Sequence, residues 1–220
     1  MRITEALTAL LVAAAAAAPQ PAVPPAQEVA AALQKKYDAI RDFTADFVHD
    51  SEGGLLRKKR IERGVVQVKK PGKMRWEYKD PEPKVFVSDG RRIYLYVPAD
   101  NQVIISPVPA EDQATTAVLF LVGKGNLTRD FTVTYAEGGG ADTYALRLQP
   151  RLPERDYEWL QIVVDRRTLQ IRSLTAADSQ GGRSTFELSN FKENLGLSDK
   201  TFAFRIPRGA DVTDHGLSSR

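Results

Sequence analysis

The sequence predicts a mainly β protein in which about ten or eleven short antiparallel strands form one curled sheet, with one or two helices beside it. Three observations support this fold class. Most of the 220 residues fall into short runs in which apolar and polar side chains alternate. Turn signals such as Asp89-Gly90 and residues 137–142 separate the runs, which favours a meander of consecutive strands. A sheet with this many strands must curl, close or split.

Composition excludes several classes of protein. Hydrophobic residues make up 42% of the chain, enough for a core, and the formal charge of +3 is below that of a typical nucleic-acid binder. Cysteine is absent and histidine occurs only as His49 and His215, so disulfides and thiolate chemistry are excluded. Neither a GxSxG elbow nor a glycine-rich phosphate loop occurs. We therefore expect no enzyme activity, no metal or cofactor site and no nucleic-acid partner.

The first residues are expected to precede the folded domain. Residues 1–18 combine Arg2 with an apolar run from Ala6 to Ala18, which predicts a secretory signal peptide with an approximate cleavage site. The run is shorter than the roughly 20 residues that span a bilayer. Residues 19–26 form a proline-rich linker. Because a lipid anchor would need a cysteine at the cleavage point, we expect a soluble exported protein.

The domain is predicted to begin with an amphipathic helix within residues 26–42, since Val29, Leu33, Tyr37 and Ile40 follow helical spacing on one face. The hydrophobic period then changes from helical spacing to two. Strands are predicted over residues 43–50, 63–70, 73–78, 84–90, 92–98 and 102–108. The fifth of these strands is apolar on both faces, so part of the sheet is expected to be covered on both sides.

A second helix is predicted over residues 111–125, where acidic residues precede and glycines follow an apolar patch. The patch, from Ala117 to Val122, fits either a buried helix or an apolar flap over a cavity. Strands resume over residues 131–136, 143–150, 157–165, 169–178, 184–191 and 200–207. Residues 213–220 are expected to form a polar tail.

The inward side of the curled sheet is predicted to be an apolar wall. Alternation places seven side chains on it: Phe47, Val66, Val68, Met74, Trp76, Ile93 and Leu95. Such a wall either packs as a solid core or leaves a hollow that suits a hydrophobic ligand, and alternation alone leaves both readings open. The basic run Arg57–Arg63 fits a charged, solvent-facing strand, with contact to anionic lipid headgroups as the alternative.

The order of several motifs resembles the LolA family, the periplasmic carriers of outer-membrane lipoproteins. The resemblance is strongest at residues 43–47, 64–78 and 87–98, and weaker similarity continues through 115–125, 160–178 and 200–212. It implies a single domain over residues 27–212. The implied fold is an unclosed antiparallel β-barrel of about eleven strands, covered by the N-terminal helix and by a central lid helix.

The resemblance implies a soluble periplasmic chaperone that shelters lipoprotein acyl chains in an apolar cavity. The implied partners are acylated lipoproteins, an inner-membrane ABC-type complex that loads the carrier and an outer-membrane receptor that unloads it, and a monomer is expected. The implied cavity combines the seven wall residues with Tyr37, Ile40, Val118, Leu119 and Leu121.

Lys70 departs from the family pattern, in which an arginine usually precedes the proline of this motif and is linked to lid closure. We expect Lys70 to act as the lid latch, less tightly than an arginine, because lysine offers three donors on a flexible stem. A solvated lysine at the end of a strand is the alternative. Met74 stands where the family often has a larger apolar residue, and it is pliable enough to line a lipid pocket.

Two other functions stay open. A lipid- or lipoprotein-responsive envelope-stress sensor uses the same fold in related proteins, although such sensors usually add a second domain. A hydrolase of the cell envelope would require a buried carboxylate pair or a Ser–His pair in the cavity.

Overall fold

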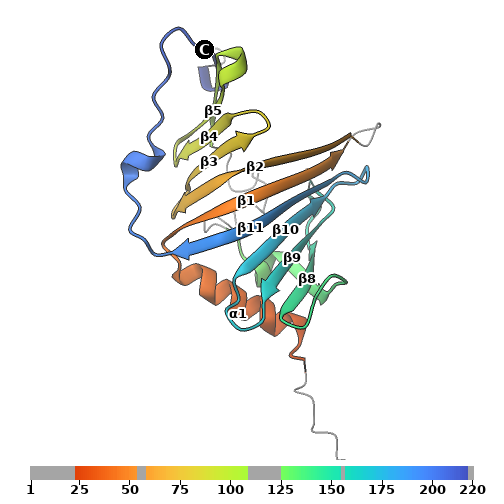
Figure 1. Cartoon of the computed structure of the whole chain (residues 1–220). Helices are drawn as coiled ribbons and strands as arrows, with labels where there is room; N and C mark the ends of the chain where they lie inside the picture. The colour runs from red at the N-terminus through yellow and green to blue at the C-terminus, as the bar shows by residue number, and fades with distance from the viewer. Residues whose placement is uncertain (1–22, 54–57, 109–124, 155–156, 218–220) are drawn as a thin grey trace, which may run out of the picture.

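A computed structural model of the chain describes residues 23–53, 58–108, 125–154 and 157–217. In these ranges, twelve strands form one strongly twisted sheet, and a helix crosses one end of it (Figure 1). The strands are β1 (Asp42–Gly53), β2 (Lys58–Lys69), β3 (Lys73–Asp80), β4 (Lys84–Asp89), β5 (Arg92–Val97), β6 (Gln102–Pro107), β7 (Phe131–Tyr135), β8 (Thr143–Pro150), β9 (Trp159–Asp165), β10 (Ile171–Ala177), β11 (Arg183–Glu193) and β12 (Asp211–Asp214). The helices are α1 (Ala26–Ala39) and α3 (Leu127–Asp130), with short 3₁₀ turns η1 (Pro98–Asp100), η2 (Asp199–Phe202) and η3 (His215–Leu217).

The sheet consists of two meanders joined side by side. Its strand order is β12-β6-β5-β4-β3-β2-β1-β11-β10-β9-β8-β7, so β1 pairs with β2 on one side and with β11 on the other. The two edge strands, β7 and β12, lie at opposite ends of this order and do not pair with each other. The predicted fold class, a mainly β protein with an unclosed and largely antiparallel barrel, is confirmed.

The sequence analysis misses β12 and wrongly predicts a strand over residues 200–207, where the chain forms the turn η2 and then continues without regular structure. The described strands number twelve with β12 included. Among its four residues only Val212 is apolar, so no alternating pattern marks it. The strand forms because the chain returns along β6 and pairs with it in parallel, with Val212 opposite Val103. It crosses the predicted boundary between the domain and the polar tail.

The N-terminal helix forms where helical spacing predicts it. α1 begins at Ala26, the last residue of the predicted linker, and ends at Ala39. Its apolar face, with Val29, Leu33 and Tyr37, is buried in the core cluster that includes the inward side chains of the sheet. Burial of this face, rather than a strong cap, holds the helix, because Pro25 at the N-cap offers no side-chain hydrogen bond.

Two predicted segments fall outside the described residues. These are the signal peptide over residues 1–18 and the central helix over residues 111–125, apart from Gly125. The chain continues into α3, whose first turn is capped by Asn126: its side-chain oxygen accepts hydrogen bonds from the amides of Thr128 (3.0 Å) and Arg129 (2.8 Å). Among the helices of the described ranges, none combines the length and the apolar character that a bilayer crossing requires.

Residues 194–210, here called the C-terminal arm, leave β11 and run past β3–β5 toward the opposite end of the sheet (Figure 1). The buried carboxylate of Asp42 anchors the start of the arm by accepting hydrogen bonds from the amides of Leu195 (2.7 Å) and Gly196 (3.1 Å). Farther along, the ring of Phe204 stacks on that of Tyr94 with centroids 5.2 Å apart. The arm therefore covers the outer face of β5, as the apolar character of both faces of this strand predicts.

We predict that Gly64→Ala destabilises the protein, because a Cβ at this position would meet the backbone carbonyl of Glu77 and lie 2.8 Å from the ring of Phe47. Such overpacking in the centre of a sheet should lower the free energy of unfolding by about 2 kcal/mol. Urea denaturation provides the measurement. Gly53→Ala is the matched control, since no atom lies within 4 Å of its added Cβ. Equal stability of the two variants would contradict the prediction.

Candidate functional site

The side of the sheet that packs against α1 is here called the inner wall. Near α1 it is formed by Phe43 of β1 together with Val68 and Met74, which are paired across β2 and β3. The ring of Phe43 stacks on that of Phe191 with centroids 4.8 Å apart, and Tyr37 of α1 lies against the same ring at 6.4 Å. This level of the wall is filled by the protein's own side chains.

The next level along the strands is aromatic. The ring centroid of Phe47 lies 5.1 Å from that of Trp76 and 4.9 Å from that of Tyr78, both in edge-to-face contact. Phe186 of β11 completes the group, 5.0 Å from Trp76 and 6.0 Å from Phe47. Aromatic rings from β1, β3 and β11 thus form one continuous apolar surface.

The wall residues predicted from alternation share one face, as the register shows: Val66 lies opposite Trp76, and Trp76 lies opposite Phe86 on the next strand. Most of the predicted cavity residues are buried in the core cluster: Tyr37, Ile40, Phe47, Val66, Val68, Met74 and Trp76. Ile93 and Leu95 are only half-buried. Val118, Leu119 and Leu121 lie outside the described residues, and the assignment of this set to lipid binding stays a prediction.

The inner wall stays partly exposed where it crosses β4, β5 and β6. Phe86, Leu95 and Ile104 lie opposite one another on these strands, and all three are half-buried. We call these three residues, together with Ile93, the β4–β6 patch. Because Phe86 is paired with Trp76, the patch continues the aromatic level without interruption.

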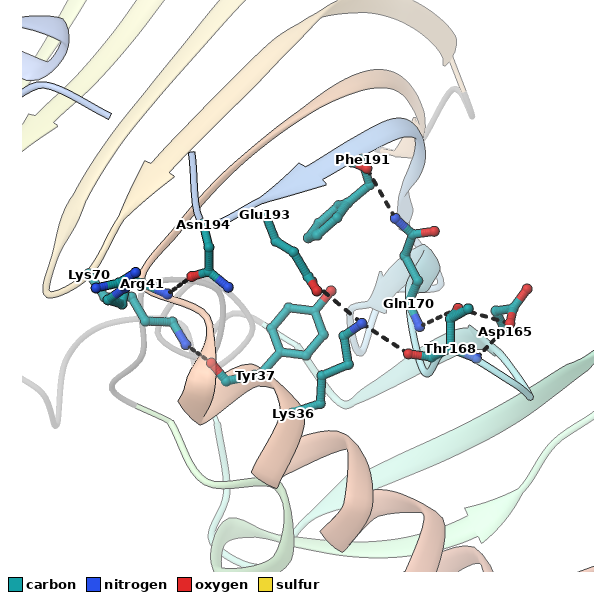
Figure 2. A network of polar contacts seen from close by, with 10 residues as sticks. All are labelled: Lys36, Tyr37, Arg41, Lys70, Asp165, Thr168, Gln170, Phe191, Glu193 and Asn194. Carbon is teal, nitrogen blue, oxygen red and sulfur yellow. Dashed lines mark hydrogen bonds and ion pairs between the residues drawn. The ribbon is translucent and has the colours of Figure 1, made fainter. Parts of the chain in front are cut away.

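Lys70 lies at the end of β2 and points at the last turn of α1 (Figure 2). Its ammonium donates a hydrogen bond to the backbone carbonyl of Tyr37. A cation at the C-terminus of a helix is favourable, since the last carbonyls lack helical partners. Burial lowers the pKa of Lys70, and the carboxylate of Asp38 opposes that shift. The contact is the one a latch on α1 would need, and the latch role itself stays a prediction.

Other polar contacts also hold α1 (Figure 2). The ammonium of Lys36 donates to the carbonyl of Thr168 (2.9 Å) and lies 3.4 Å from the carboxylate of Glu193. On another side of the helix, the side-chain oxygen of Gln34 accepts a buried hydrogen bond from the amide of Leu127 in α3 (2.8 Å). The helix is thus fastened to the end of β2, to the turn before β10, to β11 and to α3.

Beyond the aromatic level, away from α1, a row of polar side chains crosses the inner wall; we call it the polar row. Nε2 of His49 lies 2.9 Å from the hydroxyl of Ser184, and its Nδ1 lies 3.4 Å from a carboxylate oxygen of Glu62. The other oxygen of Glu62 accepts a hydrogen bond from the ammonium of Lys84 at 2.7 Å. The row therefore connects β11, β1, β2 and β4.

The electrostatics of the polar row follow from its burial. Glu62 is only 3% exposed, and its charge is compensated by Lys84. Burial lowers the pKa of His49, while Glu62 opposes the shift. Burial, with Glu62 nearby, raises the pKa of Tyr78 to about 12, and the ammonium of Lys84 lies 4.2 Å from the centroid of its ring.

Sequence reasoning missed the polar row, because it considered Glu62 only as part of the basic run Arg57–Arg63. The sequence nevertheless indicates where Glu62 points. Glu62 alternates in step with Gly64, Val66 and Val68 on the same strand, so its side chain faces the inner wall. The neighbouring cations form ion pairs of the kind expected for a solvent-facing strand: Lys59 pairs with Asp50, and Arg63 pairs with Asp80. Arg57 lies outside the described residues.

Ser184, His49 and Glu62 have the order of a Ser–His–acid triad, which the hydrolase hypothesis would require. The separation of 3.4 Å between His49 and Glu62 exceeds an ordinary hydrogen bond. Ser184 also lies within β11 and is paired with both β1 and β10, so the surrounding backbone serves the sheet instead of forming an oxyanion hole. The arrangement therefore lacks the geometry of a hydrolase. No cluster of metal-ligating side chains occurs within the described ranges either.

Comparison with known proteins places these features in a family. Residues 38–205 match the family described as outer membrane lipoprotein carrier protein LolA. The chain is similar to the outer-membrane lipoprotein carrier proteins of Chromohalobacter salexigens (31% identity, covering 87% of each chain) and Legionella pneumophila (29%, covering 84% of this chain and 90% of the relative). Its fold is similar to that of an uncharacterized conserved protein from Thermus thermophilus, with a TM-score of 0.55 at 14% identity, covering 86% of this chain and 98% of that one.

We predict that Lys70→Met loosens the last turn of α1, because the variant cannot donate to the carbonyl of Tyr37. Loss of this contact should cost on the order of 1 kcal/mol locally and speed amide exchange in the helix about fivefold. Hydrogen–deuterium exchange of α1 peptides provides the measurement. Lys70→Arg should retain the protection, and Lys35→Met, at an exposed position of the same helix, is the control. Unchanged exchange in Lys70→Met would refute this role of the contact.

We predict that the protein loses stability between pH 8 and pH 5.5, because the pKa of His49 is lower in the folded than in the unfolded state. The unfolded chain then binds more protons as the pH falls through the ordinary histidine value of about 6.5, which favours unfolding. Urea midpoints at both pH values provide the measurement. His49→Gln should reduce the loss, whereas His215→Gln, at an exposed position, should retain it. The same loss in both variants would assign the effect to other groups.

Proposed function

Because the chain belongs to the LolA family of outer membrane lipoprotein carrier proteins, we propose that it shelters the acyl chains of lipoproteins on its inner wall. Proteins of this family are carriers and not enzymes, and the chain is non-enzymatic. The observation that carries the proposal is the continuous apolar surface that runs from the buried aromatic level to the half-buried β4–β6 patch.

The energetics of an acyl chain fit such a surface. Burying hydrocarbon contributes roughly 0.8 kcal/mol per methylene group, so a 16-carbon chain gains on the order of 10 kcal/mol when it leaves water. Such a chain crosses an aqueous compartment slowly unless a protein covers it. The β4–β6 patch offers apolar side chains that are only half-covered, so binding there needs less rearrangement than binding at Trp76 or Phe47.

In this proposal α1 moves to open the level of the wall where Tyr37 and Phe43 lie against Phe191. Its polar contacts, such as those of Lys70 and Lys36 with backbone carbonyls, are replaceable by water at small net cost. Its apolar face, with Leu33 and Tyr37, would otherwise become exposed, and an acyl chain entering the wall would cover the surface that the helix leaves. In this proposal, cargo and helix compete for the same apolar wall.

The remaining parts of the proposal concern location and partners. We propose that the protein acts as a monomer in the periplasm, to which the predicted signal peptide would direct it. An ATP-driven complex of the inner membrane would load the carrier, and a receptor of the outer membrane would take the cargo. This scheme requires the wall to be covered reversibly, because a carrier must release what it binds.

We predict that the purified protein binds a fluorescent 16-carbon fatty acid saturably and that an acylated lipoprotein displaces the probe. Leu95→Ser should weaken this binding about tenfold, because it removes apolar surface from the β4–β6 patch while the position is only half-buried. Fluorescence titration provides the measurement.

Val65→Ser is the matched control, since Val65 is also half-buried in a central strand but has the opposite parity to Val66 on the inner wall. Circular dichroism should show both variants folded. The proposal fails if the protein shows no saturable binding of the probe, or if both variants weaken binding equally.

A further inference from the structure

We propose that the polar row binds the carbonyl oxygen through which an acyl chain is joined to the rest of the ligand. The ligand chemistry is a neutral acyl ester or amide, with its hydrocarbon along the aromatic level and its carbonyl at Lys84, assisted by Arg60. This inference rests on the proposed function and adds to it the position and chemistry of the ligand's polar end.

The first argument is the order of levels along the inner wall. On β1, the inward side chains run from Phe43 through Phe47 to His49, and on β2 the register places Val68, Gly64 and Glu62 opposite them. The wall therefore changes from apolar side chains, many of them aromatic, to polar ones in the direction away from α1. A ligand with a hydrocarbon tail and a polar end has its apolar and polar parts in the same order.

The second argument is the energetic cost of the row. Glu62 is 3% exposed, His49 15% and Lys84 26%, so the row takes a carboxylate almost fully out of water and partly buries its ammonium partner. A buried ion pair of this kind often contributes no more stability than apolar residues of the same size. The fold alone gives no reason for charges on the inner wall, whereas a polar ligand group does.

The third argument is the kind of group that the row offers. Both oxygens of Glu62 already face protein groups, His49 and Lys84. Lysine carries three N–H donors, and Lys84 directs one of them at Glu62. The exposed fraction of the side chain rises from 26% at Lys84 to 57% at Arg60, which lies 3.9 Å from the same carboxylate. The accessible side of the row thus presents donors, which fit an oxygen acceptor.

The charges of the row favour a neutral acceptor over an anion. Glu62 compensates Lys84 at 2.7 Å, and Glu82 lies 3.6 Å from the guanidinium of Arg60. A phosphate or a free carboxylate would gain little attraction from these paired cations and would meet the negative charge of Glu62. An ester or amide carbonyl accepts a hydrogen bond without that repulsion.

A matched pair of probes tests the inference: 1-palmitoylglycerol, an ester, and 1-O-hexadecylglycerol, an ether that lacks the carbonyl oxygen. Each is titrated against the fluorescent fatty acid bound to the protein, and the ratio of the two affinities is measured. The ester should bind about tenfold more tightly than the ether, the size expected for one hydrogen bond to a charged donor.

The test variant combines Glu62→Gln with Lys84→Met, because removing one partner alone would leave a buried unpaired charge and threaten the fold. It should lose the preference for the ester and keep its affinity for the ether. The control combines Asp50→Asn with Lys59→Met, an ion pair of 2.9 Å that joins β1 and β2 on the opposite face of the sheet. The control should keep the preference.

Equal affinity of the unchanged protein for the two glycerides would overturn the inference and leave the proposed function standing. An unchanged preference in the test variant, or its loss in the control, would also overturn it. If neither glyceride binds saturably, both the inference and the proposed function fail.

Discussion

The pairing of β1 with β11 is the contact on which the rest of the structure depends. It places Phe47 opposite Leu188 and His49 opposite Phe186, and so joins two meanders that would otherwise be separate sheets. The aromatic level and the polar row both cross this pair of strands. Because the cost of closing a long loop grows only slowly with its length, the chain tolerates so distant a pairing when the apolar contact across it is extensive.

Alternation in the sequence predicts which face of a strand a side chain occupies, and it placed Val66, Trp76 and Leu95 on one wall as the register has them. It does not predict which distant strand lies alongside. The contact between His49 and Ser184 joins residues 135 positions apart, so it depends on a register that no local pattern reveals. Nor could the sequence identify the carbonyl of Tyr37 as the partner of Lys70. A carbonyl at the end of α1 lies beside Lys70 only once the helix is packed on the sheet.

Two kinds of contact hold α1, and they differ in how they respond to a ligand. The apolar face of the helix is buried against the wall, and under the proposed function a hydrocarbon chain takes its place. The hydrogen bonds of Gln34 and Lys36 are directional and end on particular backbone groups, so under the proposed function they would determine where the helix returns. A wall that combines exchangeable apolar cover with directional polar contacts suits reversible binding better than a sealed core does.

The parallel return of β12 along β6 has a consequence for self-association. An unclosed sheet presents strand edges to which another chain can add, and a protein with an apolar inner wall is especially exposed to aggregation by that route. Here β12 pairs with β6 and covers its edge. The edge that β12 itself exposes is four residues long, with an aspartate at each end. Short, charged edges are poor templates for strand addition, so at the β12 end the open sheet offers a neighbouring chain little to extend.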